Sequence, residues 1–339
     1  MVPTTELESA FLPDHEAPFR GELLGTNRLT ASARRLARGQ QWTARKTKMR
    51  TPLLGLVETA ADQLDACYRI LSADARNDIP VSPAAEWLLD NYYLIEEQLQ
   101  LVHDDLPADY GAELPRLESG PLAAFPRIFE AIVYLTAHTD SRIEREQLEL
   151  FIMAYQEVSP LTIGELWAVP IMLRIALVEN LRRLALRVLA AHQAVVAGDR
   201  FADRLLAAVE SGPEVMAARI AELDEAHRES PAPFLVRLSQ RLASQDVALA
   251  PLADWLEHTL QERQESLQHL ATATHTAQAA DQVSIAAAIT SIRLLDGLEW
   301  REFFEETSLV EHALGRDPAG VYARMDAVGR DRYRHALEG

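Results

Sequence analysis

Apolar residues recur at helical spacing along most of this chain, and the densest such pattern lies between Pro160 and Ala185. Arg174 and apolar residues share one stripe of this segment, and both faces are apolar from 169 to 176. This pattern predicts a helix that protein surrounds on all sides. A buried arginine there needs a carboxylate or carbonyl partner, because an unpaired buried charge is strongly destabilising. The other residues of the stripe are Trp167, Ile171, Val178, Leu181 and Ala185.

The start and the interruptions of this helix can be predicted too. Thr162 and Glu165 have the spacing of a capping box, which stabilises a helix start by about 1 kcal/mol. Pro170 predicts a kink or two abutting helices, because proline removes a helical hydrogen bond. Gly198 predicts a turn. A solvent-facing side is predicted further along by the charged residues Glu179, Arg183 and Arg187.

A second apolar stripe contains two amides. It belongs to a predicted helix capped by Ser82, and Asn91 and Gln98 lie among its apolar residues. Because buried amides are hydrogen-bonded, we predict a buried polar network. Asp90 borders the stripe and is the first candidate partner for Arg174. This network either orients neighbouring helices or forms a ligand site.

No alternating pattern of useful length predicts a strand, so we predict an all-α, multi-helix bundle. The bundle is either single or divided into two packed helical subdomains. Residues 1–27 are expected to be irregular and residues 28–50 to form a basic helix. The expected subdomains are 51–230, centred on 160–197, and 231–339, which we expect to be truncated at its C-terminal end. Pro231 and Pro233 mark their boundary.

Composition supports helix and limits the function. Among 339 residues there are 14 glycines and one cysteine, Cys67, so helix is favoured and a disulfide framework is excluded. We interpret Cys67 as a small buried hydrophobe in a reducing compartment rather than as a catalytic thiol. The net charge of −18 argues against general nucleic-acid binding.

One stretch departs from the acidic balance, since residues 28–50 carry eight Arg or Lys and no acid. Three interpretations remain open. The stretch docks on the protein's own acidic surface, faces an anionic membrane leaflet, or contacts nucleic acid. The candidate membrane-facing or partner-facing residues are Arg34, Arg35, Arg38, Arg45, Lys46, Lys48 and Arg50.

No motif of catalysis or metal binding is recognisable. The sequence has no Gly-rich phosphate loop, no HExxH, no paired CxxC and no GxSxG. His138 and Asp140 are close in sequence, but a helix start explains Asp140 better than a metal pair does. We therefore predict no catalytic, cofactor-binding or metal-binding residue in this chain.

Four segments in order nevertheless resemble a known family. They are SPAAEWLLDNYYLIEEQL (82–99), AAFPRIFEAIVYLTAHTDSR (123–142), SPLTIGELWAVPIMLRIALVENLRRLA (159–185) and DPAGVYARMDAVGRDRYRHALE (317–338). They resemble the cytosolic N-terminal region of bacterial cyclic β-1,2-glucan synthetases. Departures are small: Phe125 and Phe129 stand where tyrosines are expected.

The resemblance implies a large membrane enzyme whose glucosyltransferase domain, outside these residues, uses UDP-glucose and a divalent metal. The expected function of this chain is that of a non-catalytic scaffold or regulatory region at the cytoplasmic face of the bacterial inner membrane. Its expected partners are the remaining domains of the synthetase and an anionic membrane surface. Two alternatives remain open: a self-associating helical scaffold, and a carbohydrate-binding or carbohydrate-active module. The sugar platforms of such a module would be Trp87, Trp167, Trp255 or Trp300.

Overall fold

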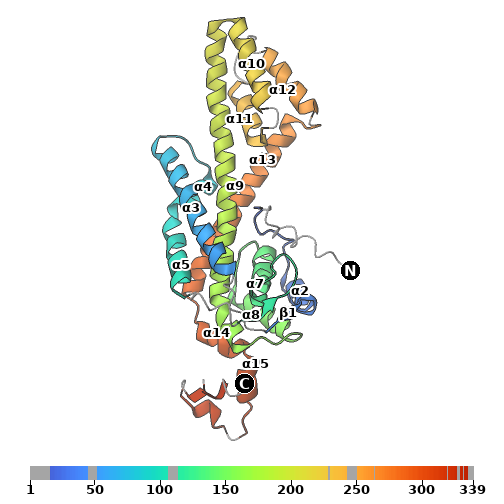
Figure 1. Cartoon of the computed structure of the whole chain (residues 1–339), viewed down its shortest axis with the longest axis vertical. Coiled ribbons are helices and arrows are strands. Elements are labelled where there is room, and N and C mark those ends of the chain that lie inside the picture. The colour runs from blue at the N-terminus through green and yellow to red at the C-terminus, as the bar shows by residue number, and fades with distance from the viewer. Residues whose placement is uncertain are drawn as a thin grey trace. The chain divides into compact units, whose positions relative to one another are not determined.

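The computed structural model describes residues 16–44, 52–105, 114–227, 230–242, 250–262, 264–318, 320–326, 329–330 and 332–334. Over these residues the regular secondary structure is helical apart from two strands of two residues each, so the all-α prediction is confirmed (Figure 1). In chain order the elements are α2 (Thr26–Gly39), β1 (Trp42–Thr43), α3 (Pro52–Arg76), α4 (Pro83–Asp90), α5 (Tyr92–Asp105), β2 (Arg116–Leu117), α7 (Arg127–His138), α8 (Arg145–Gln156), α9 (Ile163–Ser211), α10 (Pro213–His227), α11 (Ala232–Leu242), α12 (Ala250–Glu262), α13 (Leu267–Asp296), α14 (Trp300–Thr307), α15 (Leu309–Leu314) and the 3₁₀ turn η2 (Tyr322–Arg324).

The chain forms two compact units, and neither is continuous in sequence. Unit 1 comprises Met1–Ala66, Asp90–Leu184 and Ser284–Gly339, and unit 2 comprises Cys67–Leu89 and Ala185–Val283. The helices α3, α9 and α13 each contribute residues to both units.

These units do not divide where the sequence suggested. The boundary expected at Pro231 falls inside unit 2. Phe201 and Phe234, on either side of it, belong to one hydrophobic core, with their ring centroids 6.3 Å apart. The two prolines mark the start of a helix here, since α11 begins at Ala232. Proline is tolerated in the first turn of a helix.

The capping box at the start of α9 is confirmed. The Thr162 hydroxyl accepts from the Glu165 amide at 3.1 Å, and the Glu165 carboxylate accepts from the Thr162 amide at 2.9 Å. From this start α9 continues for 49 residues, with Pro170 inside it. The expected turn at Gly198 is absent, because the helix passes through that residue.

Gly198 has a packing role instead. A Cβ atom at this position would lie 3.1 Å from the Phe234 carbonyl oxygen and 3.2 Å from the Arg237 Cβ. The missing side chain therefore lets α11 approach the backbone of α9 closely within unit 2. Glycine inside a helix costs about 1 kcal/mol relative to alanine, and close helix packing offsets that cost here.

The expected basic helix over 28–50 is wrong in its extent. Helix α2 ends at Gly39, and Gln40 is extended, with φ −66° and ψ 128°. Trp42 and Thr43 then pair with Leu117 and Arg116 in an antiparallel ladder. Residues 45–51 lie outside the described part of the chain, so nothing tests the expectation for Arg45, Lys46, Lys48 and Arg50.

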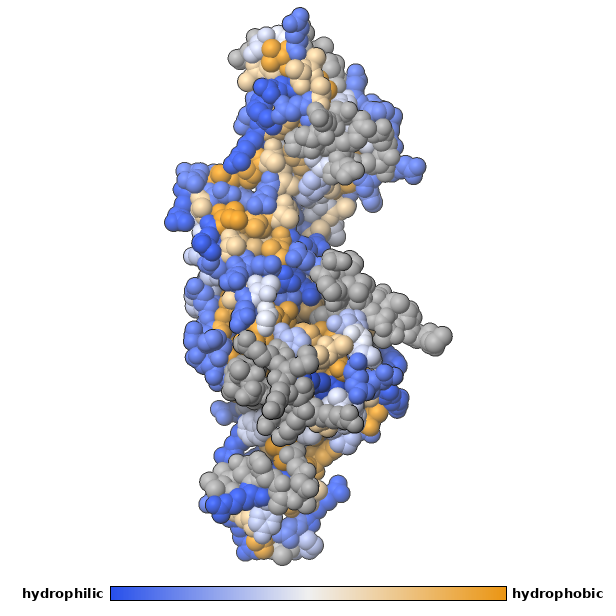
Figure 2. All heavy atoms as spheres, viewed as in Figure 1, coloured by the Kyte–Doolittle hydropathy of each residue, from blue (hydrophilic) through white to orange (hydrophobic). Residues whose placement is uncertain are grey.

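The buried and solvent-exposed faces predicted for α9 are partly reversed. Trp167 is 43% exposed, although it stacks on Phe304 at 4.7 Å between ring centroids. Glu179 and Arg183 are buried, with exposures of 1% and 6%, while Arg187 is exposed as predicted. Hydrophilic residues cover most of the face seen in Figure 2, and hydrophobic residues form separate patches on it.

The role of Gly198 can be tested by substitution. Gly198→Ala should fail to stabilise the protein and should lower the free energy of unfolding by about 1–3 kcal/mol, because the new Cβ overpacks the contact with α11. Gly55→Ala in α3 is the control, since nothing lies within 4 Å of its Cβ position. It should stabilise by up to about 1 kcal/mol. Urea unfolding measures the free energy of unfolding of both variants. An equal increase in the two would contradict the packing role of Gly198.

Candidate functional site

A buried ion pair joins the starts of α7 and α9 in unit 1. Arg127 Nε donates to one oxygen of Glu165 at 2.7 Å, and Nη2 donates to the other at 2.8 Å. Their side chains are 1% and 0% exposed. Arg127 also donates to the Ser159 hydroxyl and to the Pro160 carbonyl oxygen, each at 2.7 Å. All three guanidinium nitrogens are therefore hydrogen-bonded to the turn before α9 or to the first turn of α9.

Polar groups on the other side of Arg127 extend this cluster. The Trp42 ring lies 4.0 Å from the guanidinium carbon, in a cation–π contact. Gln40 donates to the Arg127 carbonyl oxygen at 3.1 Å and to the Glu130 carboxylate at 2.7 Å. The Tyr155 hydroxyl donates to the Gln40 side-chain oxygen. The cluster thus links the end of α2 and strand β1 to α7, α8 and the start of α9.

Burial determines the electrostatics of this cluster. Desolvation lowers the pKa of Arg127, but the hydrogen bonds and the charge of Glu165 outweigh it, so the pKa is raised. Desolvation raises the pKa of Glu130, although the hydrogen bond from Gln40 opposes the shift. Tyr155 has a raised pKa, mainly because it is buried. Arg127 is therefore a permanent charge, and the interior of unit 1 favours the protonated form of Glu130.

A second charged cluster attaches the N-terminal segment of the described chain to α9. Glu179 accepts from Arg182 at 2.8 Å and from Arg183 at 2.7 Å. Arg183 also donates to the Ala17 carbonyl oxygen at 3.0 Å and lies over the Phe19 ring at 4.4 Å. Desolvation lowers the pKa of Arg183 despite this carboxylate. The charges that predicted a solvated side of α9 are therefore covered.

The residues of the predicted polar network lie in two separate sets of contacts. Arg174 pairs with Asp296 at 2.9 Å, and Gln98 donates to the other oxygen of Asp296 at 3.4 Å. Asn91 accepts from Arg293 at 2.5 Å. Asp90 is exposed, so its expected role as the partner of Arg174 is wrong. Asp296 and Arg293 follow these residues by about 120 to 200 positions in sequence, and local spacing carries no signal for such pairs.

The basic face of α2 is partly neutralised by neighbouring acids. Arg34 forms a bidentate pair with Glu157 after α8, with contacts of 2.7 and 2.9 Å. Arg28 makes a similar pair with Glu22. Arg35 donates to the Ser32 hydroxyl at 2.6 Å, and Arg38 is exposed. Helix α2 packs against α8 and α7, so part of its charge serves the protein's own surface.

The tryptophans proposed as sugar platforms differ in exposure. Trp255 is buried in the core of unit 2. Trp87 and Trp167 are 37% and 43% exposed. Trp300 donates its ring N–H to the Leu295 carbonyl oxygen at 3.1 Å.

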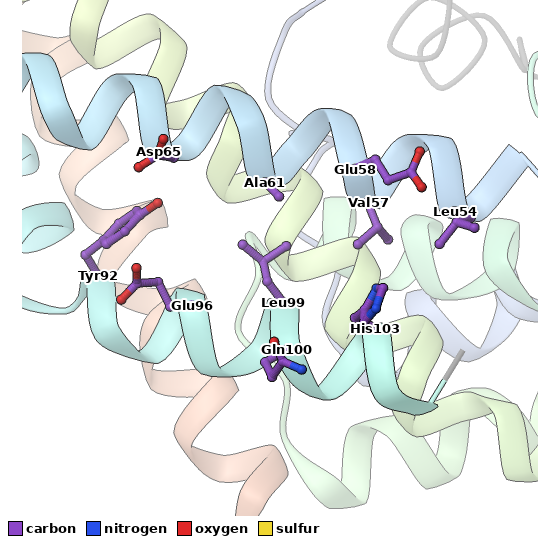
Figure 3. Close-up of a pocket in the computed structure, with 10 residues that line it drawn as sticks. All are labelled: Leu54, Val57, Glu58, Ala61, Asp65, Tyr92, Glu96, Leu99, Gln100 and His103. Carbon is purple, nitrogen blue, oxygen red and sulfur yellow. The ribbon is translucent and has the colours of Figure 1, made fainter. Parts of the chain in front are cut away.

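An open groove runs between α3 and α5 in unit 1 and is the candidate binding site (Figure 3). Its volume is about 350 Å³. The two helices run antiparallel, so that Asp65 lies near Tyr92, and His103 lies near the start of α3. Its lining residues are Leu54, Val57, Glu58, Ala61, Asp65, Tyr92, Glu96, Leu99, Gln100 and His103. This combination of apolar and acidic side chains suits a cationic, partly apolar ligand.

The described residues offer neither a metal site nor a membrane-spanning helix. No group of three or more His, Cys, Asp or Glu among them is placed to hold a metal ion. Within that same part of the chain, no helix has the length and apolar character needed to cross a bilayer.

Fold and interior together define an all-helical protein assembled around buried arginine–carboxylate pairs. No protein-family model matches the chain. The cyclic beta-(1,2)-glucan synthase NdvB of Rhizobium meliloti (strain 1021) is 31% identical to it over 274 residues, which are 80% of this chain. The chain is therefore related to a cyclic glucan synthase, as its sequence segments suggested. It spans 9% of the length of that relative.

Replacing Arg127 should destabilise the protein strongly. Arg127→Met leaves the Glu165 carboxylate buried without its cation, which should cost about 3–5 kcal/mol. Arg174→Met is the matched control, because its partner Asp296 is 37% exposed, and loss of a pair this close to solvent costs about 1 kcal/mol or less. Thermal and urea unfolding measure both. Equal losses would contradict the special role of the Arg127–Glu165 pair.

Glu130 should make stability depend on pH. Its pKa is raised in the folded state, so its contribution is fully present below the ordinary glutamate pKa and is lost as pH rises through the folded pKa. Glu130→Gln keeps an oxygen that accepts from Gln40 and removes this loss. The variant should match the wild type near about pH 4 and exceed its stability near about pH 8. The exposed carboxylate control, Glu118→Gln, should show no such divergence in urea unfolding.

Proposed function

We propose that this chain is a non-catalytic helical scaffold region of a cyclic β-(1,2)-glucan synthase. The observation that carries the proposal is the 31% identity over 80% of the chain to a protein named as such a synthase. The interior supports a scaffold role, because several of its buried charges pair with one another. The pair of Arg127 and Glu165 joins α7 to α9. Glu179 pairs with Arg182 and Arg183 of its own helix, and Arg183 contacts the segment that precedes α2.

The parent enzyme would supply the chemistry. In this proposal its glucosyltransferase domain uses UDP-glucose and a divalent metal, and it lies outside the present chain. The partners of the scaffold are then the remaining domains of the synthase, together with an anionic membrane surface. The location is the cytoplasmic face of the bacterial inner membrane. Arg35 and Arg38, which have no carboxylate partner among the described residues, are the part of α2 available to such a surface.

A turnover assay and a glucan assay test the proposal together. The purified chain, with UDP-glucose and Mg²⁺ or Mn²⁺, should release no UDP above the protein-free blank. In the full-length synthase, deleting this region or introducing Arg127→Met should lower the cyclic glucan made per cell, because the scaffold is lost or unfolded. Arg174→Met is the matched control and should leave glucan output near the wild-type level.

Two results would contradict the proposal. UDP release that rises in proportion to the concentration of the purified chain would make it catalytic. Unchanged glucan output after deletion of the region would show that the synthase does not need it.

A further inference from the structure

The groove between α3 and α5 has a recessed apolar floor. Leu54, Ala61 and Leu99 are half-buried, and Val57 is 7% exposed. Leu99 projects from α5 toward the short side chain of Ala61 on α3 (Figure 3), and both residues line the hollow. Its volume is about 350 Å³, which lies at the lower end of the range of ligand-binding clefts.

The rim of the groove is acidic. Glu58, Asp65 and Glu96 line it, and no Lys or Arg does. Glu58 and Glu96 are exposed, and neither makes an ion pair with a described residue. His103 and Gln100 complete the polar part of the lining. The carboxylates of Glu58 and Glu96 are therefore available to a cationic partner, whereas the buried Glu165 and Glu179 already have arginine partners.

Length and charge together select the kind of partner. From Leu54 to Asp65, α3 advances eleven residues, which is about 16 Å or three helical turns. An amphipathic helix of that length presents aliphatic residues at i, i+3 or i+4 and i+7, which matches a narrow apolar floor. Basic residues beside that stripe would lie over the two acidic edges. An anionic membrane surface would instead be repelled by the same carboxylates.

We propose that the α3–α5 groove binds a cationic amphipathic helix from a polypeptide segment outside this chain. The aliphatic side chains of that helix fill the hollow around Ala61 and Leu99. Its Lys or Arg residues pair with Glu58 and Glu96. The inference does not depend on the proposed function, since the groove belongs to unit 1 whatever protein contains it.

A designed peptide tests the proposal on the full chain. The probe is a fluorescent 14-residue helix of Leu and Lys, with Leu at i, i+3, i+4 and i+7, and its partner peptide carries Glu in place of Lys. Fluorescence anisotropy should show saturable binding of the Lys peptide only. The double variant Glu58→Lys with Glu96→Lys should weaken binding about tenfold or more, because two attractive pairs become repulsive.

Matched variants separate the groove from the overall negative charge. Glu118→Lys with Glu146→Lys makes the same charge change at exposed positions outside the groove and should change the affinity less than about twofold. Ala61→Phe fills the hollow without changing charge and should also abolish tight binding. Helical circular dichroism and an unchanged melting temperature confirm that each variant folds.

Three results would overturn the inference: equal weakening by both charge-reversed pairs, full affinity in Ala61→Phe, or equal binding of the Lys and Glu peptides. Binding of the wild-type chain to vesicles of anionic lipid that is lost in Ala61→Phe would also overturn it, because the groove would then face a bilayer.

Discussion

The ion pair between Arg127 and Glu165 is the interaction on which the organisation of unit 1 depends. Glu165 acts twice, since the same carboxylate accepts from the Thr162 amide and from the Arg127 guanidinium. The Glu165 carboxylate therefore determines both where α9 begins and where α7 packs against it. Because neither side chain reaches solvent, the charges are compensated by each other and by their protein neighbours, namely Ser159, Pro160, Thr162 and Trp42.

Local patterns in the sequence predicted where α9 begins, but they did not predict that Arg127 pairs with Glu165. The capping box uses residues three positions apart, so Thr162 and Glu165 could be read directly from their spacing. Arg127 lies 38 residues away, and nothing in its own neighbourhood distinguishes it from a solvated arginine at a helix start. Asp90, the predicted partner of Arg174, borders the apolar stripe of a different helix, the one that contains Asn91 and Gln98, yet the actual partner, Asp296, comes from α13. Helix periodicity is local, whereas charge pairing is a property of the assembled fold.

Gly198 and Glu179 also show that tertiary packing can override a prediction made from local sequence. Glycine usually ends or interrupts a helix, and this expectation failed because α11 needs the space that a side chain would fill. Charged residues usually face solvent, and this expectation failed because Ala17 and Phe19 cover Arg183. In each case a contact distant in sequence overrode a sound local preference. The helical fold itself was predictable, since apolar periodicity is repeated in nearly every segment.

The carboxylates of unit 1 fall into two groups: those that pair with arginine within the fold, and those that do not. The buried ion pairs with Glu165 and Glu179 are made by arginine, whose planar guanidinium suits a bidentate contact with a carboxylate. Glu165 and Glu179 are therefore fully committed to the fold, and Glu157 holds α2 by its contact with Arg34. Glu58 and Glu96 stabilise no such contact with a described residue, although they flank an apolar hollow. Acids that the fold does not use, placed beside unfilled apolar surface, are the part of unit 1 best suited to recognise another helix.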